Sequence, residues 1–434
     1  MTDSITELNE IISQLRQPPN SIQDLAQRVS LCRRALSLLP RTQNEQLWVA
    51  LNMELGDSLA QLPTGDQGEN IEQAIAAYQQ ALQVTTRDAD PHAWAITMMS
   101  LANAYKHRIW DDRADNLEQA IAAYQQVLEV FTHDTTPVEW AITMMNLAIA
   151  YQDRIRGDLA ENIEQAITCY QAAIQVFTGT NMTVEWAIAT MNLANAYAER
   201  MKGDPAANIE RSITNYQAVL QLFAPDTMPV EWAIATMNLA NAYADRIEGD
   251  PAANIEQAIT YYEAALQVFT QDAMPVDWAQ TVNNLANTYI SRIEGDQADN
   301  IERAIAAYQA ALEVRTRAAM PVAWAETMNN LGNAYTDRIE GDPTANIEQA
   351  IAAYRAALEV RTHAAMPVGW AQTMSNLALA YTKRIEGDRA ANIEQAIAAY
   401  QAALQVFTRA AMPVEWAETM DSLAAVEANR SQSS

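Results

Sequence analysis

Hydrophobic and polar positions follow a pattern that returns every 46 residues along most of the chain. Tryptophan marks the period nine times, with no insertion or deletion between the copies: Trp48, Trp94, Trp140, Trp186, Trp232, Trp278, Trp324, Trp370 and Trp416. Asparagine followed by Ile or Leu and then Glu runs in step: Asn70, Asn116, Asn162, Asn208, Asn254, Asn300, Asn346 and Asn392. A strict period of this length predicts a stack of one supersecondary unit.

The first part of each repeat has the spacing of an amphipathic helix, seen clearly after Met320. Its apolar residues stand three, four and seven positions apart. They are Trp324, Met328, Leu331, Ala334, Tyr335 and Ile339. Pro321 fits the first turn, where its missing N–H does no harm. Gly341 is expected to end the helix, because glycine tolerates the left-handed conformation found there.

The second part of each repeat predicts another helix. Asn346 is the expected N-cap, and Gln349 three residues later makes a variant of the capping box. The apolar stripe consists of Ile347, Ala350, Ile351, Tyr354, Ala357, Leu358 and Val360. Alanine favours helix and lets neighbouring helices approach closely. Two antiparallel helices cannot bury both stripes alone, so neighbouring pairs are expected to stack.

The unbroken period predicts one elongated all-α array of antiparallel helix pairs rather than several globular domains. Residues 1–43 are expected to form a degenerate helix pair that caps the N-terminal end. Residues 44–412 contain eight regular pairs, and residues 413–434 a solvating C-terminal helix with a disordered tail. The terminal repeats of such an array differ from the others because one of their faces meets water.

Leu331-Gly332 with Ala334-Tyr335, followed by Ala350, Tyr354 and Ala357, resembles the tetratricopeptide signature. The usual tetratricopeptide repeat has about 34 residues, so longer helices and loops are expected here, and Ala replaces the signature Gly in most repeats. The Asn-Leu-Ala or Asn-Leu-Gly core more closely resembles the long, kinesin-light-chain-like repeats. The full pattern resembles arrays that precede caspase-like CHAT domains in cyanobacterial proteins.

This resemblance covers residues 44–429. It implies a right-handed α-solenoid, a superhelix whose first helices line a concave surface. It also implies a role in protein–protein interaction.

The charge of the chain is strongly acidic, with 54 Asp and Glu against 27 Lys and Arg and a formal net charge of −27. Nucleic-acid binding needs a basic stripe, and anionic membrane surfaces are disfavoured for the same reason. No stretch reaches the roughly 18 apolar residues of a membrane span. A neutral or basic protein or peptide is therefore the expected partner.

The N-terminus lacks the basic start and apolar run of a signal peptide. Cys32 and Cys169 lie about three repeats apart, too far to form a disulfide, and we expect both to be reduced and structural. The expected location is therefore the cytoplasm.

The sequence contains no pattern that predicts catalysis or a cofactor. Its four histidines have no metal-ligand spacing, and there is no Gly-rich phosphate loop or Cys-x-x-Cys motif. Because the repeats run nearly to residue 434, the caspase-like domain of similar arrays is not expected here. Asp342, Asn346 and Glu348 bring oxygen atoms together, but their spacing does not match a calcium-binding loop. Helix capping and pairing with Arg338 explain them better, so no metal site is expected.

Two sets of asparagines on the first helices are the candidate binding residues. One set stands directly before the core Leu: Asn146, Asn192, Asn238, Asn284 and Asn330. The other stands two residues after it and faces away from the core stripe: Asn103, Asn195, Asn241, Asn287 and Asn333. Such a ladder suits the backbone of an extended peptide, because an amide both donates and accepts hydrogen bonds. The alternative is that the asparagines bond to neighbouring helices.

An apolar strip accompanies this ladder in the middle of the chain, formed by Ile142, Met145, Ile188, Met191, Ile234 and Met237. Exposed on a concave wall, it would complete a peptide groove, because Met adapts to varied side chains. Alternatively, these residues pack between neighbouring first helices. The equivalent positions are polar after residue 250: Gln280, Asn283, Glu326 and Asn329.

These patterns together predict a non-catalytic scaffold or adaptor that holds an extended peptide in a concave groove. Two alternatives remain open. One is a regulatory sensor, in which a peptide or small ligand changes the curvature of the array. The other is a structural solenoid that associates with itself.

Overall fold

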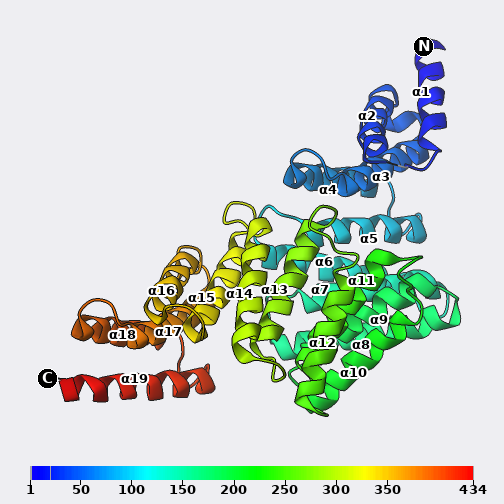
Figure 1. Ribbon diagram of the computed structural model, residues 1–434. Coiled ribbons are helices and arrows are strands. Elements are labelled where there is room, and N and C mark those ends of the chain that lie inside the picture. The colour runs from blue at the N-terminus through cyan, green and yellow to red at the C-terminus, as the bar shows by residue number, and fades with distance from the viewer. Residues whose placement is uncertain (1, 20, 434) are drawn as a thin grey trace. The chain divides into compact units, whose positions relative to one another are not determined.

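The fold of the chain is an all-α repeat solenoid, as a computed structural model of residues 2–19 and 21–433 shows (Figure 1). No strand occurs in these residues. The helices form two compact units, residues 1–215 and residues 216–434. No helix within the described ranges is long and apolar enough to span a membrane.

The N-terminal unit is a series of helix pairs. It contains α1 (Thr2–Leu15), α2 (Ile22–Leu38), η1 (Arg41–Gln43), α3 (Glu45–Gln61), α4 (Gln67–Leu82), α5 (Pro91–His107), α6 (Arg113–Leu128), α7 (Pro137–Gln152), α8 (Leu159–Gly179), α9 (Thr183–Ala198) and most of α10 (Pro205–Leu220). The odd-numbered helices from α3 to α9 are the first helices of the 46-residue repeats, and the even-numbered helices are their partners.

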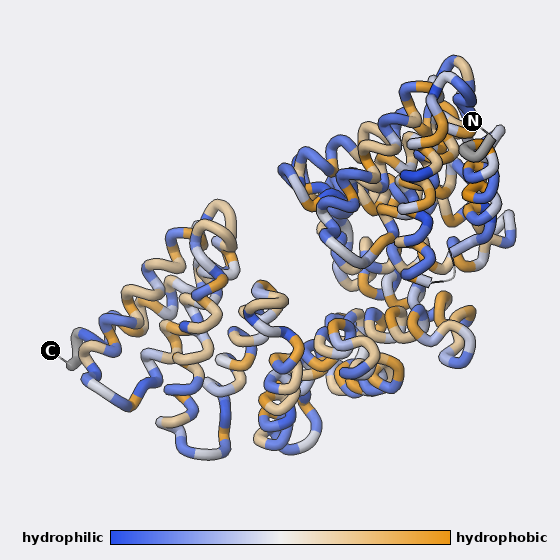
Figure 2. Tube along the Cα trace, turned by 90° about the horizontal axis from the view of Figure 1, so that it is seen from above, coloured by the Kyte–Doolittle hydropathy of each residue, from blue (hydrophilic) through white to orange (hydrophobic). Residues whose placement is uncertain are grey.

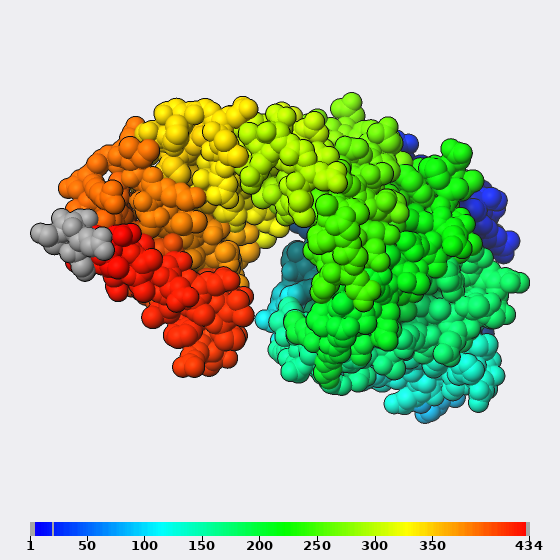
Figure 3. All heavy atoms as spheres, turned by 60° about the horizontal axis from the view of Figure 1, so that its bottom comes forward, coloured from blue at the N-terminus to red at the C-terminus, as the bar shows by residue number. Residues whose placement is uncertain are grey.

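The C-terminal unit continues the same order after the end of α10. It contains α11 (Pro229–Ala244), α12 (Pro251–Ala265), α13 (Pro275–Ile290), α14 (Gln297–Val314), α15 (Pro321–Asp337), α16 (Pro343–Leu358), α17 (Pro367–Lys383), α18 (Arg389–Ala403) and α19 (Pro413–Ser433). Figure 3 shows the later helices of this unit, from yellow to red, packed one after another. Leu423 and Val426 of α19 join the last core cluster and cover α18.

The helix starts confirm one sequence expectation and correct another. Pro321 is indeed in the first turn of α15. Asn346, however, does not cap α16: this helix begins at Pro343, and the Asp342 side chain accepts a hydrogen bond from the amide of Ala345. Asn346 is already inside the first turn, is 3% exposed, and donates from Nδ2 to the carbonyl of Glu340 at 2.7 Å. The earlier Asp-Pro start signal outweighs the asparagine.

The loop between the two helices also begins earlier than expected. Helix α15 ends at Asp337, four residues before Gly341. Gly341 does have the left-handed conformation, with φ of 82°, but it lies in the loop. Ile339 consequently lies outside the core stripe and is 58% exposed, so its assignment to the buried face was wrong.

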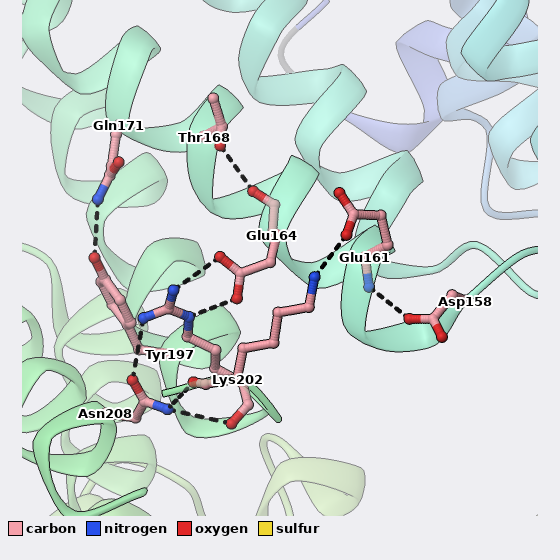
Figure 4. A network of polar contacts seen from close by, with 9 residues as sticks. Asp158, Glu161, Glu164, Thr168, Gln171, Tyr197, Lys202 and Asn208 are labelled. Carbon is pink, nitrogen blue, oxygen red and sulfur yellow. Dashed lines mark hydrogen bonds and ion pairs between the residues drawn. The ribbon is translucent and has the colours of Figure 1, made fainter. Parts of the chain in front are cut away.

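In most repeats an arginine just after the first helix forms an ion pair with the preceding repeat. Arg200 donates from Nε and Nη2 to the two carboxylate oxygens of Glu164, at 2.7 and 2.8 Å. Figure 4 shows Glu164 with two dashed contacts at its carboxylate. These hydrogen bonds lower the pKa of Glu164. Arg338 makes the equivalent pair with Glu302. The sequence had suggested acids within the same loop, whereas the partner belongs to the second helix of the preceding repeat.

The core lies mainly along the second helices. Each contains a buried tyrosine, as at Tyr78, Tyr124, Tyr262 and Tyr354, surrounded by fully buried alanines. The signature Gly332 lies against this tyrosine: a Cβ there would be 2.6 Å from the ring of Tyr354, so the two helices approach very closely. Figure 2 shows apolar stretches recurring along the helices, whereas most connecting loops are hydrophilic.

Candidate functional site

The asparagines that follow the core Leu point toward the tyrosine of their own repeat. The Oδ1 atoms of four of them accept a hydrogen bond from a tyrosine hydroxyl, at 2.5 to 2.7 Å. The pairs are Tyr124–Asn103, Tyr262–Asn241, Tyr308–Asn287 and Tyr354–Asn333. Asp57 occupies the same position in the first repeat and accepts from Tyr78 at 2.8 Å. These side chains therefore satisfy buried hydroxyl groups in addition to facing the surface.

The asparagines that precede the core Leu connect neighbouring first helices in the C-terminal unit. Asn284 of α13 donates from Nδ2 to Oδ1 of Asn241 on α11, at 3.0 Å. Asn330 of α15 donates in the same way to Asn287 of α13, at 3.2 Å. Asn284 and Asn330 therefore do bond to neighbouring helices, which was the alternative to peptide binding. Each accepting oxygen thus uses both lone pairs. The side-chain amide N–H groups of Asn241 and Asn287 have no hydrogen-bond acceptor among the described residues.

A pocket of about 390 Å³ opens between α11, α12 and α13 in the C-terminal unit. Three predicted residues line it together, Asn241, Asn284 and Asn287. Asp245, Tyr262, Thr288 and Ser291 complete its polar lining. Burial raises the pKa of the Asp245 carboxyl. The pocket thus combines amide donors and acceptors with one carboxyl group, the chemistry that binds a peptide backbone.

A second pocket, of about 400 Å³, occupies the same repeat position in the N-terminal unit, between α3, α4, α5 and α7. Asp57, Tyr78, Asn103 and Asn146 line it. Asp57 corresponds to Asn241 four repeats later, and Tyr78 to Tyr262. The same pocket therefore occurs in two repeats that have an amide or a carboxyl group at equivalent positions.

The pocket in the N-terminal unit has one cation that the other lacks. Lys106 lines it, is only 7% exposed, and corresponds to Ile290 in the C-terminal unit. Burial lowers the pKa of Lys106, and it also lowers the pKa of the neighbouring His107. Nothing in the repeat pattern predicted this pocket lysine, because its position holds Gln, Ala, Ile or Thr in other repeats.

The predicted strip of Ile and Met is mostly packed into the structure. Met191 is 8% exposed. Met145 packs against two core clusters of the N-terminal unit, and Met237 against two of the C-terminal unit. Thr281 of α13 donates a hydrogen bond to the sulfur of Met237 on α11, at 3.1 Å. This placement favours packing between first helices, and Ile142 and Ile234 pack against the same clusters as Met145 and Met237. All six residues except Met191 keep part of their surface in solvent.

Some of the polar positions after residue 250 surround a buried arginine, which the sequence analysis did not predict. Arg315 and Arg361 stand where other repeats have buried Phe131, Phe177, Phe269 or Phe407. Arg315 is fully buried, and burial lowers its pKa. It donates to Thr327 Oγ1 at 2.9 Å and to Gln280. The replacement of Phe by Arg at this repeat position is the feature of the sequence that could have predicted a buried polar arrangement.

Sequence and structure comparisons agree with this architecture. The tetratricopeptide repeat model matches residues 140–175, 324–364 and 370–407. No curated protein matches the chain. Among solved structures, it is similar to a Rap protein complexed with competence and sporulation factor, with 11% identity and a TM-score of 0.52 over 100% of this chain and 99% of that chain.

Two further solved structures are similar over shorter ranges. The apo form of RapI has 13% identity and a TM-score of 0.48, over 72% of this chain and 97% of that chain. BtubC from P. vanneervenii has 19% identity and a TM-score of 0.42, over 58% of this chain and 91% of that chain. The three matched segments are copies of the 46-residue period and are identified as tetratricopeptide repeats, while the Rap protein shares the solenoid fold.

Proposed function

We propose that the protein is a non-catalytic scaffold that binds an extended peptide segment through its amide-lined pockets. One observation carries this proposal: the same pocket occurs at the same repeat position in both units, lined by first-helix amides and one buried tyrosine. A pocket that recurs along the array suits an extended peptide, because the N–H and C=O groups of such a peptide also recur at regular spacing. The Rap protein with this fold was itself solved as a complex, with competence and sporulation factor.

The peptide is held mainly by its backbone in this proposal. Asn241 and Asn287 offer their amide N–H groups to carbonyl groups of the peptide. Asn146, Asn192 and Asn238 occupy, in other repeats, the position that Asn284 and Asn330 hold before the core Leu. Partly exposed Ile142, Ile188 and Ile234 supply apolar contacts at the border. The net charge of −27 favours a neutral or basic peptide by steering it to the surface.

Selection from a displayed library of random peptides tests the proposal. Peptides selected on the intact protein are measured by calorimetry against Asn284→Leu plus Asn330→Leu, which replaces one amide of the pocket and its counterpart one repeat later by apolar groups of similar size. We expect roughly tenfold weaker binding or more. Gln309→Leu, an exposed change on α14, is the matched control and should leave binding unchanged. Selection of no peptide, or equal binding by all three proteins, would contradict the proposal.

A further inference from the structure

A row of exposed aliphatic side chains lies on the loops between first and second helices. In the C-terminal unit it consists of Ile247, Ile293, Ile339 and Ile385, which are 60%, 64%, 58% and 67% exposed. Ile109, Ile155 and Met201 hold the same position in the N-terminal unit and are similarly exposed. Single exposed aliphatic residues are ordinary on protein surfaces, but one that recurs at the same place in seven successive loops forms a patterned surface.

The loops do not need these side chains for their own structure. In the loop after α15, Arg338 is held by Glu302, and Asn346 donates to the carbonyl of Glu340. Gly341 supplies the left-handed turn and Asp342 caps the next helix. These interactions fix the loop on both sides of Ile339, whose side chain remains in water. The loop is thus held by its own hydrogen bonds and ion pair, and it presents Ile339 to solvent.

The residue after the aliphatic side chain differs between the two units, whereas the aliphatic residue is kept. It is Trp110, Arg156 and Lys202 in the N-terminal unit. Arg156 and Lys202 are neutralised by Asp115 and Glu161, each at 2.6 Å. In the C-terminal unit the residue is always Glu, and an Asp follows two positions later.

The row in the C-terminal unit is therefore both apolar and acidic. Its carboxylates are Glu248, Asp250, Glu294, Asp296, Glu340, Asp342, Glu386 and Asp388. The arginines of the loops after α13, α15 and α17 are engaged by Glu256, Glu302 and Glu348 of the second helices. Those glutamates balance the arginines, so the loop carboxylates keep their negative charge. Isoleucines followed by carboxylates one and three residues later complement a partner surface that is apolar and positively charged.

We propose that Ile247, Ile293, Ile339 and Ile385, with their neighbouring carboxylates, form a docking surface for a basic amphipathic segment of another protein. Apolar residues of that segment cover the four isoleucines, and its Lys or Arg side chains lie beside the carboxylates. Anionic lipid headgroups are repelled by the same carboxylates. This surface lies on the loops and shares no residue with the amide-lined pockets, so it is an interaction beyond the peptide binding proposed above.

Binding of a synthetic amphipathic helix of leucine and lysine, measured by calorimetry, tests the surface. Replacing all four isoleucines (Ile247→Ser, Ile293→Ser, Ile339→Ser and Ile385→Ser) should weaken binding roughly tenfold or more. The matched control changes four valines at the opposite ends of first helices, which are 49% to 64% exposed: Val276→Ser, Val322→Ser, Val368→Ser and Val414→Ser. It should bind like the unchanged protein. All eight positions are exposed, so circular dichroism should show the same helix content in both variants.

A second variant tests the charge. Glu248→Lys, Glu294→Lys, Glu340→Lys and Glu386→Lys introduce the residue that Lys202 already supplies at this position. This variant should no longer bind the leucine–lysine helix and should gain affinity for a leucine–glutamate helix. Asn284→Leu plus Asn330→Leu should leave both results unchanged, which separates this surface from the pockets.

Three results would overturn the proposal. One is equal binding of the leucine–lysine helix by the unchanged protein and the serine variant of the isoleucines. Another is equal affinity for a serine–lysine peptide, because attraction of charge alone would then explain binding. The third is tighter association with phosphatidylcholine vesicles than with the helix, because the surface would then be a membrane contact.

Discussion

Arg338 and Glu302 form a two-pronged ion pair between adjacent repeats, with Nε–Oε1 and Nη2–Oε2 distances of 2.6 and 2.8 Å. Both side chains are mostly buried, with 24% and 30% of their surface exposed. The same pair recurs at Arg108–Glu72, Arg154–Glu118, Arg200–Glu164, Arg292–Glu256 and Arg384–Glu348. It joins the end of each of these first helices to the preceding second helix and so helps to define the stacking of the pairs.

Removing this arginine should weaken one junction of the stack. Arg338→Ala loses two charge-assisted hydrogen bonds in a partly buried place, which should cost about 1–2 kcal/mol. The loss should appear as faster hydrogen exchange in α14, α15 and α16, because contacts in a solenoid are between nearest neighbours. Lys383→Ala, which breaks a more exposed pair with Asp337 at 3.4 Å, is the control and should cost less than about 0.5 kcal/mol. Uniform acceleration along the whole chain would contradict the nearest-neighbour account.

The carboxyl group of Asp57 should make stability depend on pH. Burial raises the pKa of Asp57, although the hydroxyl of Tyr78 opposes this effect. Its contribution to stability is therefore fully present below the unfolded pKa of about 3.9 and is lost as the pH rises through the higher folded pKa. Asp57→Asn keeps an acceptor for Tyr78 and introduces the residue that Asn241 supplies in the equivalent pocket.

The variant should accordingly melt at a higher temperature than the unchanged protein at pH 7. The difference between the two proteins should shrink as the pH falls toward 4, because Asp57 becomes protonated. Melting curves of both proteins across this range test the prediction. A difference that stays constant with pH would show that the charge of Asp57 has no part in it.

The sequence predicted the repeat, the helix pairs and the solenoid fold correctly because all three follow from the spacing of apolar residues. It misplaced the start of α16 because two start signals, Asp342-Pro343 and Asn346, stand four residues apart, and spacing alone does not rank them. The role of Asn346 inside the loop depends on the path of the backbone back to Glu340. That path is a tertiary property, which a linear pattern does not contain.

The candidate site shows the same division. The repeat pattern identified the amide positions, and the structure brings Asn241, Asn284 and Asn287 to one pocket. The pattern did not reveal that Tyr262 and Asn284 use both lone pairs of Asn241, because this requires the side chains of three helices. It also did not reveal Lys106, which occurs at its position once.

Arg315 offers a test of whether the buried guanidinium stabilises the stack. Arg315→Phe together with Gln280→Ile restores the residues of an earlier repeat, as at Phe269 and Ile234. Replacing a buried charge by a well-packed apolar group is often neutral or stabilising by about 1–4 kcal/mol. We expect a melting temperature equal to or above that of the unchanged protein. Arg315→Ala, which leaves a cavity, should be less stable by about 2–5 kcal/mol. If the double variant were less stable than the unchanged protein, the hydrogen bonds of Arg315 would be required for packing.

Met191 and Met237 distinguish a peptide-binding wall from an interhelical seam. Met191 is 8% exposed, and the sulfur of Met237 accepts a hydrogen bond from Thr281 of the next first helix. Met191→Asp plus Met237→Asp buries two carboxylates without partners, which should cost about 3 kcal/mol or more at each position. We expect the double variant to lose helix content or cooperative melting.

The matched control for this change is Met191→Leu plus Met237→Leu. It conserves volume and apolar character, and should cost less than about 1.5 kcal/mol at each position. Circular dichroism and size-exclusion chromatography measure folding in both proteins. A folded aspartate variant that had lost only the selected peptide would place the two methionines on the exposed wall of the groove. Because the sulfur of Met237 lies between α11 and α13, we expect instead that packing of the first helices fails before peptide binding can be measured.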